Sequence, residues 1–214
     1  MFQQVRKINP TRRSVSGNYP FRGDTSIPYE SSLERDFIIK QEFDNKVTQL
    51  IAQPVSIPFS ANNRTYFYTP DYLCLFNNSM NKKGILVEIK PEKEWQAHWR
   101  KWLPKWKAAS RWAHEQNFTF HIYDETRIRD VYFDNIKLVN AFKILSFSHS
   151  EIDYLFSFLH DGNQCISSFL ALFATQERNH QFRLILFLLA NHLLVTDFNQ
   201  PINEHSIISL VQES

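Results

Sequence analysis

Two short apolar segments joined by a turn-rich segment constrain the fold of this chain more than any other feature. Residues 72–76 and 85–89 are typical of strands, and the intervening letters NNSMNKKG are typical of a turn. Because adjacent strands joined by a short turn pair antiparallel, the sequence predicts a hairpin. Pairing residue 76 with residue 85 in an ideal ladder places Asp71 opposite Lys90, with Glu88 as its diagonal neighbour on the same face.

Two carboxylates and a lysine at one end of this hairpin form a set suited to phosphodiester hydrolysis. Asp71 and Glu88 can share a hard cation such as Mg²⁺, for which Mn²⁺ can substitute, and the backbone carbonyl of Ile89 can supply another oxygen. Lys90 can hold or help deprotonate the attacking water. The alternative is that Glu88 and Lys90 are ordinary polar residues on the exposed face of a half-buried strand. We favour a catalytic site because Pro70 and the glycine-terminated turn accompany the charged residues.

A helix is predicted to begin at Ser31 and to end near Asp44, with Glu34 in its first turn. Ser31 and Glu34 have the spacing of a capping box, in which the glutamate closes the helix N-terminus. The alternative is that Glu34 lies near the cation and takes part in catalysis. We favour the second role, and the capping role stays open.

Length and composition exclude several classes of protein. The chain has 214 residues, enough for one good core or two small ones, and we expect two domains. With 4 glycines, it has no Gly-rich loop that could cradle a nucleotide phosphate. Cys74 and Cys165 lie far apart in apolar runs, which predicts thiols in a reducing compartment. No stretch fits a signal sequence or a membrane span, so we expect a soluble, cytoplasmic protein with no membrane partner.

Charge divides the chain into three segments. Residues 1–30 hold 5 basic and 2 acidic residues without apolar periodicity, so we expect a basic flexible arm, with a purely connecting tail as the alternative. Residues 31–140 hold 16 basic and 13 acidic residues, and we expect nucleic acid to contact this segment together with the basic arm. Residues 141–214 hold 3 basic and 7 acidic residues, so we expect them to dock to another protein.

A tryptophan-rich segment at residues 94–117 has helical periodicity, although Pro104 predicts a break or kink. Its four regularly spaced tryptophans are Trp95, Trp99, Trp102 and Trp106. The cations among them are Arg100, Lys101, Lys105, Lys107 and Arg111. One interpretation is a surface on which bases stack. We favour tryptophans that cover a sheet, with the cations available for phosphate contact.

The order of the remaining elements indicates the fold class. A strand at residues 118–123 follows the tryptophan-rich helix, which predicts an α/β fold with a mixed sheet flanked by helices. Helical patterns then recur at residues 136–145, 150–160, 164–174 and 178–191. Two short strands flank the letters NQPINEH, so we expect a mainly helical, winged-helix-like C-terminal domain.

The motifs also resemble a known family. YTPDYLCLF followed by GILVEIKP resembles the PD-(D/E)XK motif of the restriction-endonuclease-like nucleases. Together with SSLERDF, IAQPV and FHIYDETRIRD, it resembles TnsA, the endonuclease subunit of heteromeric, Tn-type bacterial transposases. The resemblance spans residues 31–140, the expected endonuclease domain. It implies Glu34 as the helical catalytic glutamate, Asp71 and Glu88 as metal ligands, and Lys90 as the catalytic lysine.

The resemblance also implies a biological role. The chain would be a bacterial, Mg²⁺-dependent DNA endonuclease that cuts the non-transferred strand at the 5′ ends of a transposon. Its partners would be the double-stranded DNA of the transposon ends, a TnsB-like transposase, and a TnsC-like ATPase regulator bound by the C-terminal domain. Two alternatives remain: a stand-alone nuclease of the restriction or repair type, and a non-catalytic DNA-binding adaptor on the same scaffold.

Overall fold

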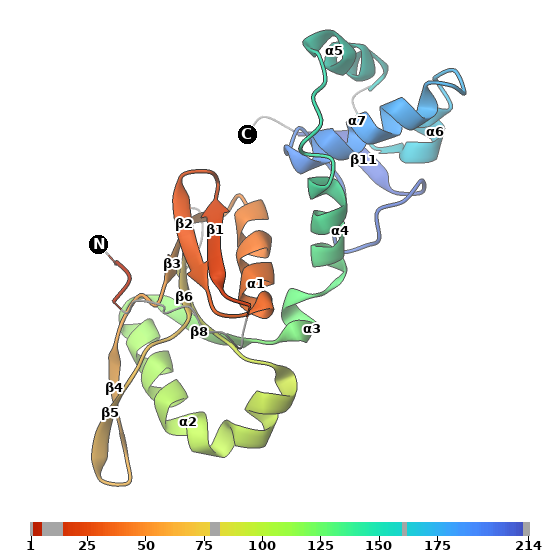
Figure 1. Ribbon diagram of the computed structural model, residues 1–214. Coiled ribbons are helices and arrows are strands. Elements are labelled where there is room, and N and C mark those ends of the chain that lie inside the picture. The colour runs from red at the N-terminus through yellow and green to blue at the C-terminus, as the bar shows by residue number, and fades with distance from the viewer. Residues whose placement is uncertain (1, 6–14, 78–81, 160–161, 212–214) are drawn as a thin grey trace. The chain divides into compact units, whose positions relative to one another are not determined.

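The chain divides into two compact units, Met1–Ile128 (unit 1) and Arg129–Ser214 (unit 2), in a computed structural model that describes residues 2–5, 15–77, 82–159 and 162–211 (Figure 1). The predicted boundary after residue 140 therefore lies inside unit 2. The reason is that Asn135 bonds to residues near the C-terminus: its Nδ2 donates to the carbonyl oxygen of Phe198 over 2.9 Å.

Unit 1 is built on a four-stranded sheet in the order β3-β6-β7-β8. The strands are β3 (Val47–Ala52), β6 (Tyr72–Phe76), β7 (Gly84–Ile89) and β8 (Phe118–Tyr123). The strand β6 is antiparallel to β3 and β7, whereas β7 and β8 are parallel and are joined through helix α2 (Glu92–Glu115). The predicted mixed sheet is thus confirmed for this unit.

The register of the β6–β7 hairpin differs from the expected one. Tyr72 pairs with Val87, so that a continued ladder brings Asp71 level with Glu88 and not with Lys90. Lys90 becomes the diagonal neighbour instead. The three charged residues still share one end of the hairpin, but the predicted opposition of Asp71 and Lys90 is wrong.

Gly84 explains the difference in register. The sequence prediction treated this glycine as the end of the turn, but Gly84 is the first residue of β7 and pairs with Leu75. A Cβ atom on Gly84 would lie 2.2 Å from the carbonyl oxygen of Cys74. Only a glycine lets the two backbones approach this closely. Ile85 therefore pairs with Cys74 and not with Phe76, which is a shift of two residues away from the turn.

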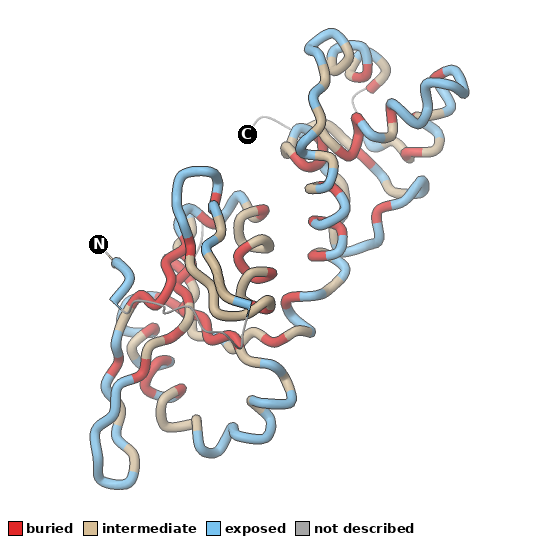
Figure 2. The backbone as a smooth tube through the Cα atoms, in the orientation of Figure 1, coloured by how far each residue is buried: buried red, intermediate tan, exposed pale blue. Residues whose placement is uncertain are grey.

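The two faces of this sheet are covered by different elements. Helix α1 (Ser32–Phe43) and the hairpin of β1 (Gly17–Phe21) and β2 (Thr25–Tyr29) pack on one face, where Phe37 and Val87 are buried. Helix α2 and the hairpin of β4 (Ile57–Ala61) and β5 (Arg64–Tyr68) pack on the other, where Leu86 is buried. Figure 2 shows that buried positions concentrate where these layers meet. Alternation along β7 therefore directs Glu88, like Leu86, toward the α2 layer.

The expectation of a flexible arm through residue 30 is wrong for residues 17–29. These residues form the β1–β2 hairpin, and Phe21 and Ile27 are buried against α1 and the sheet. The alternation in this segment is short and is interrupted by Pro20 and Pro28, which hides it in the sequence. Four of the five expected basic arm residues, Arg6, Lys7, Arg12 and Arg13, lie outside the described residues.

Helix α2 covers the sheet with Trp95, Trp102 and Trp106, as predicted, but the fourth tryptophan of the expected stripe, Trp99, is exposed. Trp106 is buried with Leu86, and the Trp95 Nε1–H donates to Asp124 over 3.0 Å. The helix is continuous through Pro104, so of the predicted break or kink the break does not occur. Figure 1 shows instead that the helix follows a curved path.

The described residues of unit 2 form four helices and a small sheet. The helices are α4 (Val131–Asn140), α5 (His149–Phe158), α6 (Ile166–Leu170) and α7 (Arg178–Ala190). The antiparallel strands β9 (Gln164–Cys165), β10 (Leu194–Val195) and β11 (Ile207–Leu210) pair in the order β10-β11-β9. The strand β9 was not foreseen. Among the described residues, no helix is long and apolar enough to cross a membrane.

Candidate active site

Asp71 lies in the short connection between β5 and β6 and is fixed by its neighbours on both sides. The Ile89 N–H donates to Asp71 Oδ2 over 2.7 Å, and the Gln53 N–H donates to the Asp71 carbonyl oxygen over 2.7 Å. The side chain therefore points along the end of β7, where Glu88 and Lys90 flank Ile89 in the sequence. Pro70, with no N–H to donate, immediately precedes it.

Glu88 is almost fully buried, with 2% of its surface exposed. The Tyr68 hydroxyl donates to Glu88 Oε2 over 2.5 Å, and Lys105 Nζ donates to Oε1 over 3.0 Å. Lys90 Nζ lies 3.7 Å from the same Oε1. The buried charge is thus compensated by two lysines and a phenol, as a carboxylate without water requires.

Lys90 follows β7 and is held by its backbone, because its N–H donates to the Tyr123 carbonyl oxygen over 3.0 Å. Burial acts to lower the pKa of Lys90, but the carboxylates of Asp71 and Glu88 outweigh burial and raise it. The ammonium form of Lys90 is therefore stabilised by the two residues that the sequence predicted beside it.

Glu34 approaches the same region from α1, on the other side of the sheet. Its N–H donates to Ser31 Oγ over 3.1 Å, and its carboxylate accepts from the Glu30 N–H over 2.8 Å and from the Ser31 hydroxyl over 3.0 Å. The Tyr72 hydroxyl also lies 3.3 Å from Glu34 Oε2. These contacts show the helix-capping role, with both oxygens engaged near the helix start.

The carboxylates in this region act on one another. Burial raises the pKa of Asp71 well above its usual range, and the charges of Glu88 and Glu34 raise it further, while Lys90 opposes them. Burial likewise raises the pKa of Glu34. Asp71, Glu88, Lys90 and Glu34 are therefore electrostatically coupled. A bound cation would relieve the repulsion among the three carboxylates.

Lys105 and Tyr68 were not foreseen as part of the site. Lys105 Nζ lies 4.6 Å from the centre of the Tyr68 ring and 5.0 Å from that of Trp102. The sequence contained a signal, because Lys105 falls within the apolar stripe that includes Trp102 and Trp106. A lysine in a buried stripe requires an anionic partner, and here the partner is Glu88.

The donors fit a divalent cation only in part. Two carboxylates, Asp71 and Glu88, share one end of the hairpin, and hard oxygen ligands suit Mg²⁺. Within the described ranges, however, no group of three or more His, Cys, Asp or Glu side chains is close enough to hold a metal ion. A cation here would thus depend on two carboxylates, the Ile89 carbonyl and water. Glu34 would not contact it directly. Glu88 would have to give up part of its contact with Lys105 in order to bind it.

Comparison with known families agrees with the motifs. Residues 44–125 match the family model described as TnsA-like endonuclease N terminal. The matched segment contains Asp71, Glu88, Lys90 and Lys105, and Glu34 precedes it. No curated protein matches the chain significantly. The resemblance to a TnsA-like endonuclease is thereby confirmed for this segment.

Proposed function

We propose that this chain, whose residues 44–125 form a TnsA-like endonuclease N-terminal domain, is the metal-dependent DNA endonuclease of a cut-and-paste transposition machinery. One observation carries the proposal. Asp71, Glu88 and Lys90 converge at the end of one hairpin inside the matched segment, with Lys90 Nζ 3.7 Å from Glu88. This set has the residue types that phosphodiester hydrolysis needs.

In this proposal, the carboxylates of Asp71 and Glu88 and the carbonyl oxygen of Ile89 hold Mg²⁺, or Mn²⁺ in its place. When bound, the cation polarises the phosphodiester and stabilises the charge that develops on it. The hydrogen bond that the Ile89 N–H donates orients the Asp71 carboxylate, and the hydrogen bond that the Tyr68 hydroxyl donates orients the Glu88 carboxylate. Outer contacts of this kind set the direction in which a carboxylate presents its free lone pairs.

Lys90 is the proposed catalytic lysine. It lies beside Glu88, and its stabilised ammonium form can hold and orient the water that attacks phosphorus and offset the charge that develops there. Glu34 is the proposed fourth member, and its capping contacts favour a role through charge and position over direct ligation. Its influence on the pKa values of Asp71 and Lys90 supports a place close to the reaction.

We further propose that the cut falls on the non-transferred strand at the 5′ ends of the transposon, with a TnsB-like transposase acting on the other strand. Unit 2 would bind a TnsC-like ATPase regulator. Its order of α5, β9, α6, α7, β10 and β11 supports a winged-helix-like domain. The 7 acidic and 3 basic residues of segment 141–214 favour a protein partner for it over DNA.

A strand-specific nicking assay tests the proposal. Duplex DNA carrying transposon ends is incubated with Mg²⁺, with and without the TnsB-like partner, and each strand is labelled separately. We expect wild type to cut at the 5′ ends, and Asp71→Ala and Lys90→Ala to lose at least about 100-fold in rate. Asp153→Ala, an exposed carboxylate of unit 2, is the control and should cut normally.

The outcomes separate the alternatives. Cutting by wild type alone, without a partner and without strand preference, would favour a stand-alone nuclease. Normal cutting by both Asp71→Ala and Lys90→Ala would exclude this site. DNA binding without cutting under any condition would favour a non-catalytic adaptor.

A further inference from the structure

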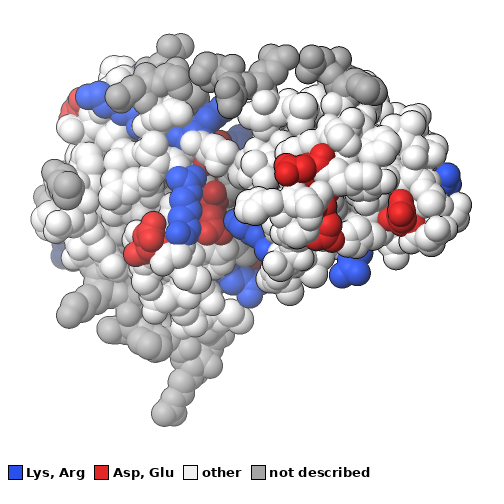
Figure 3. Space-filling model, turned by 90° about the horizontal axis from the view of Figure 1, so that it is seen from above, with Lys and Arg blue, Asp and Glu red and all other residues white. Residues whose placement is uncertain are grey.

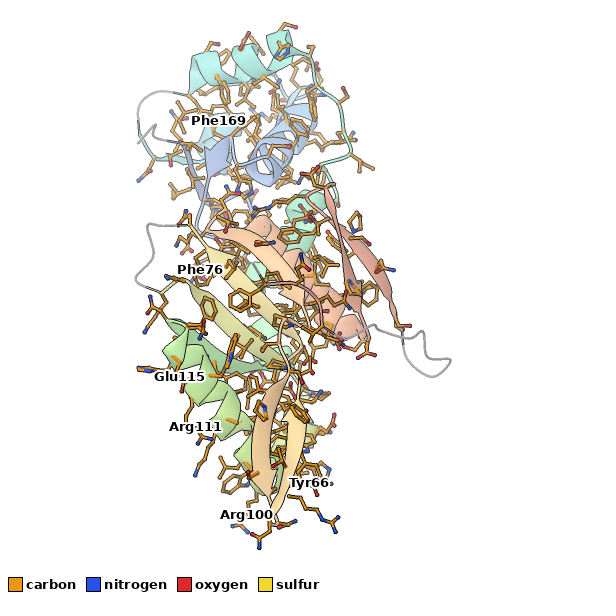
Figure 4. The ribbon with its side chains drawn as sticks, turned by 90° about the vertical axis from the view of Figure 1, so that its left-hand side faces the viewer. Tyr66, Phe76, Arg100, Arg111, Glu115 and Phe169 are labelled. Carbon is orange, nitrogen blue, oxygen red and sulfur yellow. The ribbon has the colours of Figure 1, made fainter. Side chains whose placement is uncertain are left out.

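A basic groove lies between α2 and the β4–β5 hairpin, on unit 1. Its volume is about 670 Å³, and its charged lining consists of Arg100, Lys107 and Arg111, without any acidic side chain. Its apolar lining includes Phe59 and Leu103. In Figure 4, Arg100 and Arg111 extend from α2 beside the hairpin that carries Tyr66.

The three cations follow one face of the helix. Separations of 7 and 4 residues place Lys107 and Arg111 about 20° to either side of Arg100, so that the three cations lie within about 40° of one another around the axis. With a rise of 1.5 Å per residue they span about 16 Å, which corresponds to roughly five base steps of 3.4 Å along one DNA strand. The row is therefore long enough to contact a stretch of phosphate backbone about five base steps long.

These cations are not neutralised by the protein. Within the described part of the chain, Lys107 and Arg111 have no carboxylate partner, and Arg100 contacts only the ring of Trp99, at 5.3 Å. All three are exposed. By contrast, Lys105 on the same helix is committed to Glu88. A row of unpaired, exposed cations is electrostatically complementary to a polyanion.

The β4–β5 hairpin connects this groove with the candidate active site. Thr65 lines the groove, and Tyr68, on the same strand, donates to Glu88. Three residues of extended strand cover about 10 Å, or roughly three base steps. A backbone lying in the groove would thus pass within a few nucleotides of the bond that the site would cut.

We infer that the groove between α2 and the β4–β5 hairpin binds the phosphate backbone of the duplex DNA flanking the cut. This inference rests on the proposed function. Arg100, Lys107 and Arg111 contact phosphates along this stretch, and the apolar wall of Phe59 and Leu103 lies against the sugars. Such contacts position the duplex without reading its sequence.

Binding of labelled duplex DNA to the full chain, in EDTA so that no cutting occurs, tests the inference. Kd is measured by fluorescence anisotropy across a range of salt concentrations. The groove variant is Arg100→Gln/Lys107→Gln/Arg111→Gln, and Arg111→Glu is a second, single variant. The control is Lys46→Gln/Lys93→Gln/Lys143→Gln, which removes the same charge from exposed positions outside the groove. Circular dichroism verifies the fold of each protein.

If the groove binds the backbone, the triple variant weakens binding by about tenfold or more, and the slope of log K against log salt falls by about 2.7, for three lost phosphate contacts. Arg111→Glu weakens binding more than Lys46→Gln, Lys93→Gln or Lys143→Gln does when each is made singly. Equal losses in the groove and control triples, or a wild-type chain that binds no duplex, would overturn the inference.

Cutting is measured separately, which distinguishes this inference from the proposed function. A groove variant that needs more DNA for half-maximal nicking, but reaches the wild-type rate at saturation, supports both. If the groove variant nicks DNA normally and its salt slope is unchanged, only the inference about the groove is overturned. If DNA binding depends on the groove but wild type nicks no DNA, the inference about the groove stands and the proposed endonuclease function is refuted.

Discussion

The carboxylate of Asp71 accepts an N–H from Ile89 while burial and the charges of Glu88 and Glu34 raise its pKa. Its ionised form therefore destabilises the metal-free fold. We expect Asp71→Asn, which keeps the acceptor and removes the charge, to raise the melting temperature by about 2–4 °C, the shift that about 1 kcal/mol gives in a chain of this length. Cutting should be lost. Thermal denaturation in EDTA measures the first effect, with Asp153→Asn as the control.

The same substitution should show a defined pH dependence. Because the folded-state pKa of this acid lies above its unfolded value, protonated Asp71 contributes stability at low pH that is lost as the pH rises through the folded pKa. The advantage of Asp71→Asn over wild type should therefore grow as the pH rises above about 3.9, the ordinary pKa of an aspartate. An advantage that shrinks over this range would contradict the cause that we assign.

Lys105 is the residue whose role the fold reveals most clearly. Its side chain is 17% exposed and lies 3.0 Å from Glu88, so Lys105→Met leaves a buried carboxylate with less compensation. We expect a loss of about 3 kcal/mol in the free energy of unfolding, the usual cost of breaking a buried ion pair. Denaturation in urea measures it, and Lys101→Met, on the exposed side of α2, should cost little.

A double-mutant cycle tests whether the loss comes from this pair. Glu88→Gln removes the charge that Lys105 compensates, so the double variant with Lys105→Met should be less destabilised than the two single losses added together. Additive losses would mean that Lys105 stabilises the fold only by packing on Tyr68 and Trp102. Partial recovery of Lys105→Met in Mg²⁺ would link this lysine to the cation site.

At the scale of elements, Gly84 determines the hairpin register and with it the placement of Asp71 and Glu88. The Cys74 carbonyl oxygen would lie 2.2 Å from an added Cβ, so Gly84→Ala must displace one strand. We expect a loss of more than about 3 kcal/mol, in the range of severe core substitutions. Urea denaturation checks this, and Ser60→Ala, in an exposed position of β4, should change stability by less than about 0.5 kcal/mol.

Elements with a clear start signal or an uninterrupted apolar run were predictable from sequence, and those whose apolar pattern is interrupted were not. The α1 helix begins after Ser31 as expected, because an N-cap serine and an apolar stripe both indicate it. The β1–β2 hairpin was missed because each strand has 5 residues and contains a proline. Pro104 lies inside α2 without ending it, since packing of the helix on the sheet outweighs the lost hydrogen bond.

At the scale of the whole molecule, the two units have separate cores, and Asn135 tests this separation. Its side chain bonds to the carbonyl oxygens of Phe198 and Gln200 and accepts from the Ile202 N–H over 3.0 Å. Asn135→Ala removes a buried side chain and leaves the Ile202 N–H and the two carbonyl oxygens without this partner, and it should destabilise unit 2 by about 3 kcal/mol. Amide hydrogen exchange should speed up throughout unit 2 and stay unchanged in unit 1.

The matched control is Asn140→Ala, because Asn140 lies on the same helix and its buried Oδ1 has no hydrogen-bond partner among the described residues. It should change exchange in unit 2 far less than Asn135→Ala does. Faster exchange throughout both units after Asn135→Ala would mean that they unfold as one cooperative body.

Net charge is a weak guide at this scale. The chain has a formal charge of +2, and on the face drawn in Figure 3 Lys and Arg side chains lie beside Asp and Glu side chains. The DNA binding that we propose would therefore depend on local rows of cations such as the groove on α2, and not on a uniform positive field.

The sequence by itself determined the motif around Asp71, Glu88 and Lys90, the hairpin that carries it, and the alternation of strands and helices around it, because residue type and periodicity are local properties. The tertiary structure decided the rest. The hairpin register depends on how closely two backbones approach at Gly84, and the partner of Glu88 depends on which turn of α2 packs over the sheet. Both are contacts between residues distant in the sequence, and no local pattern specifies them.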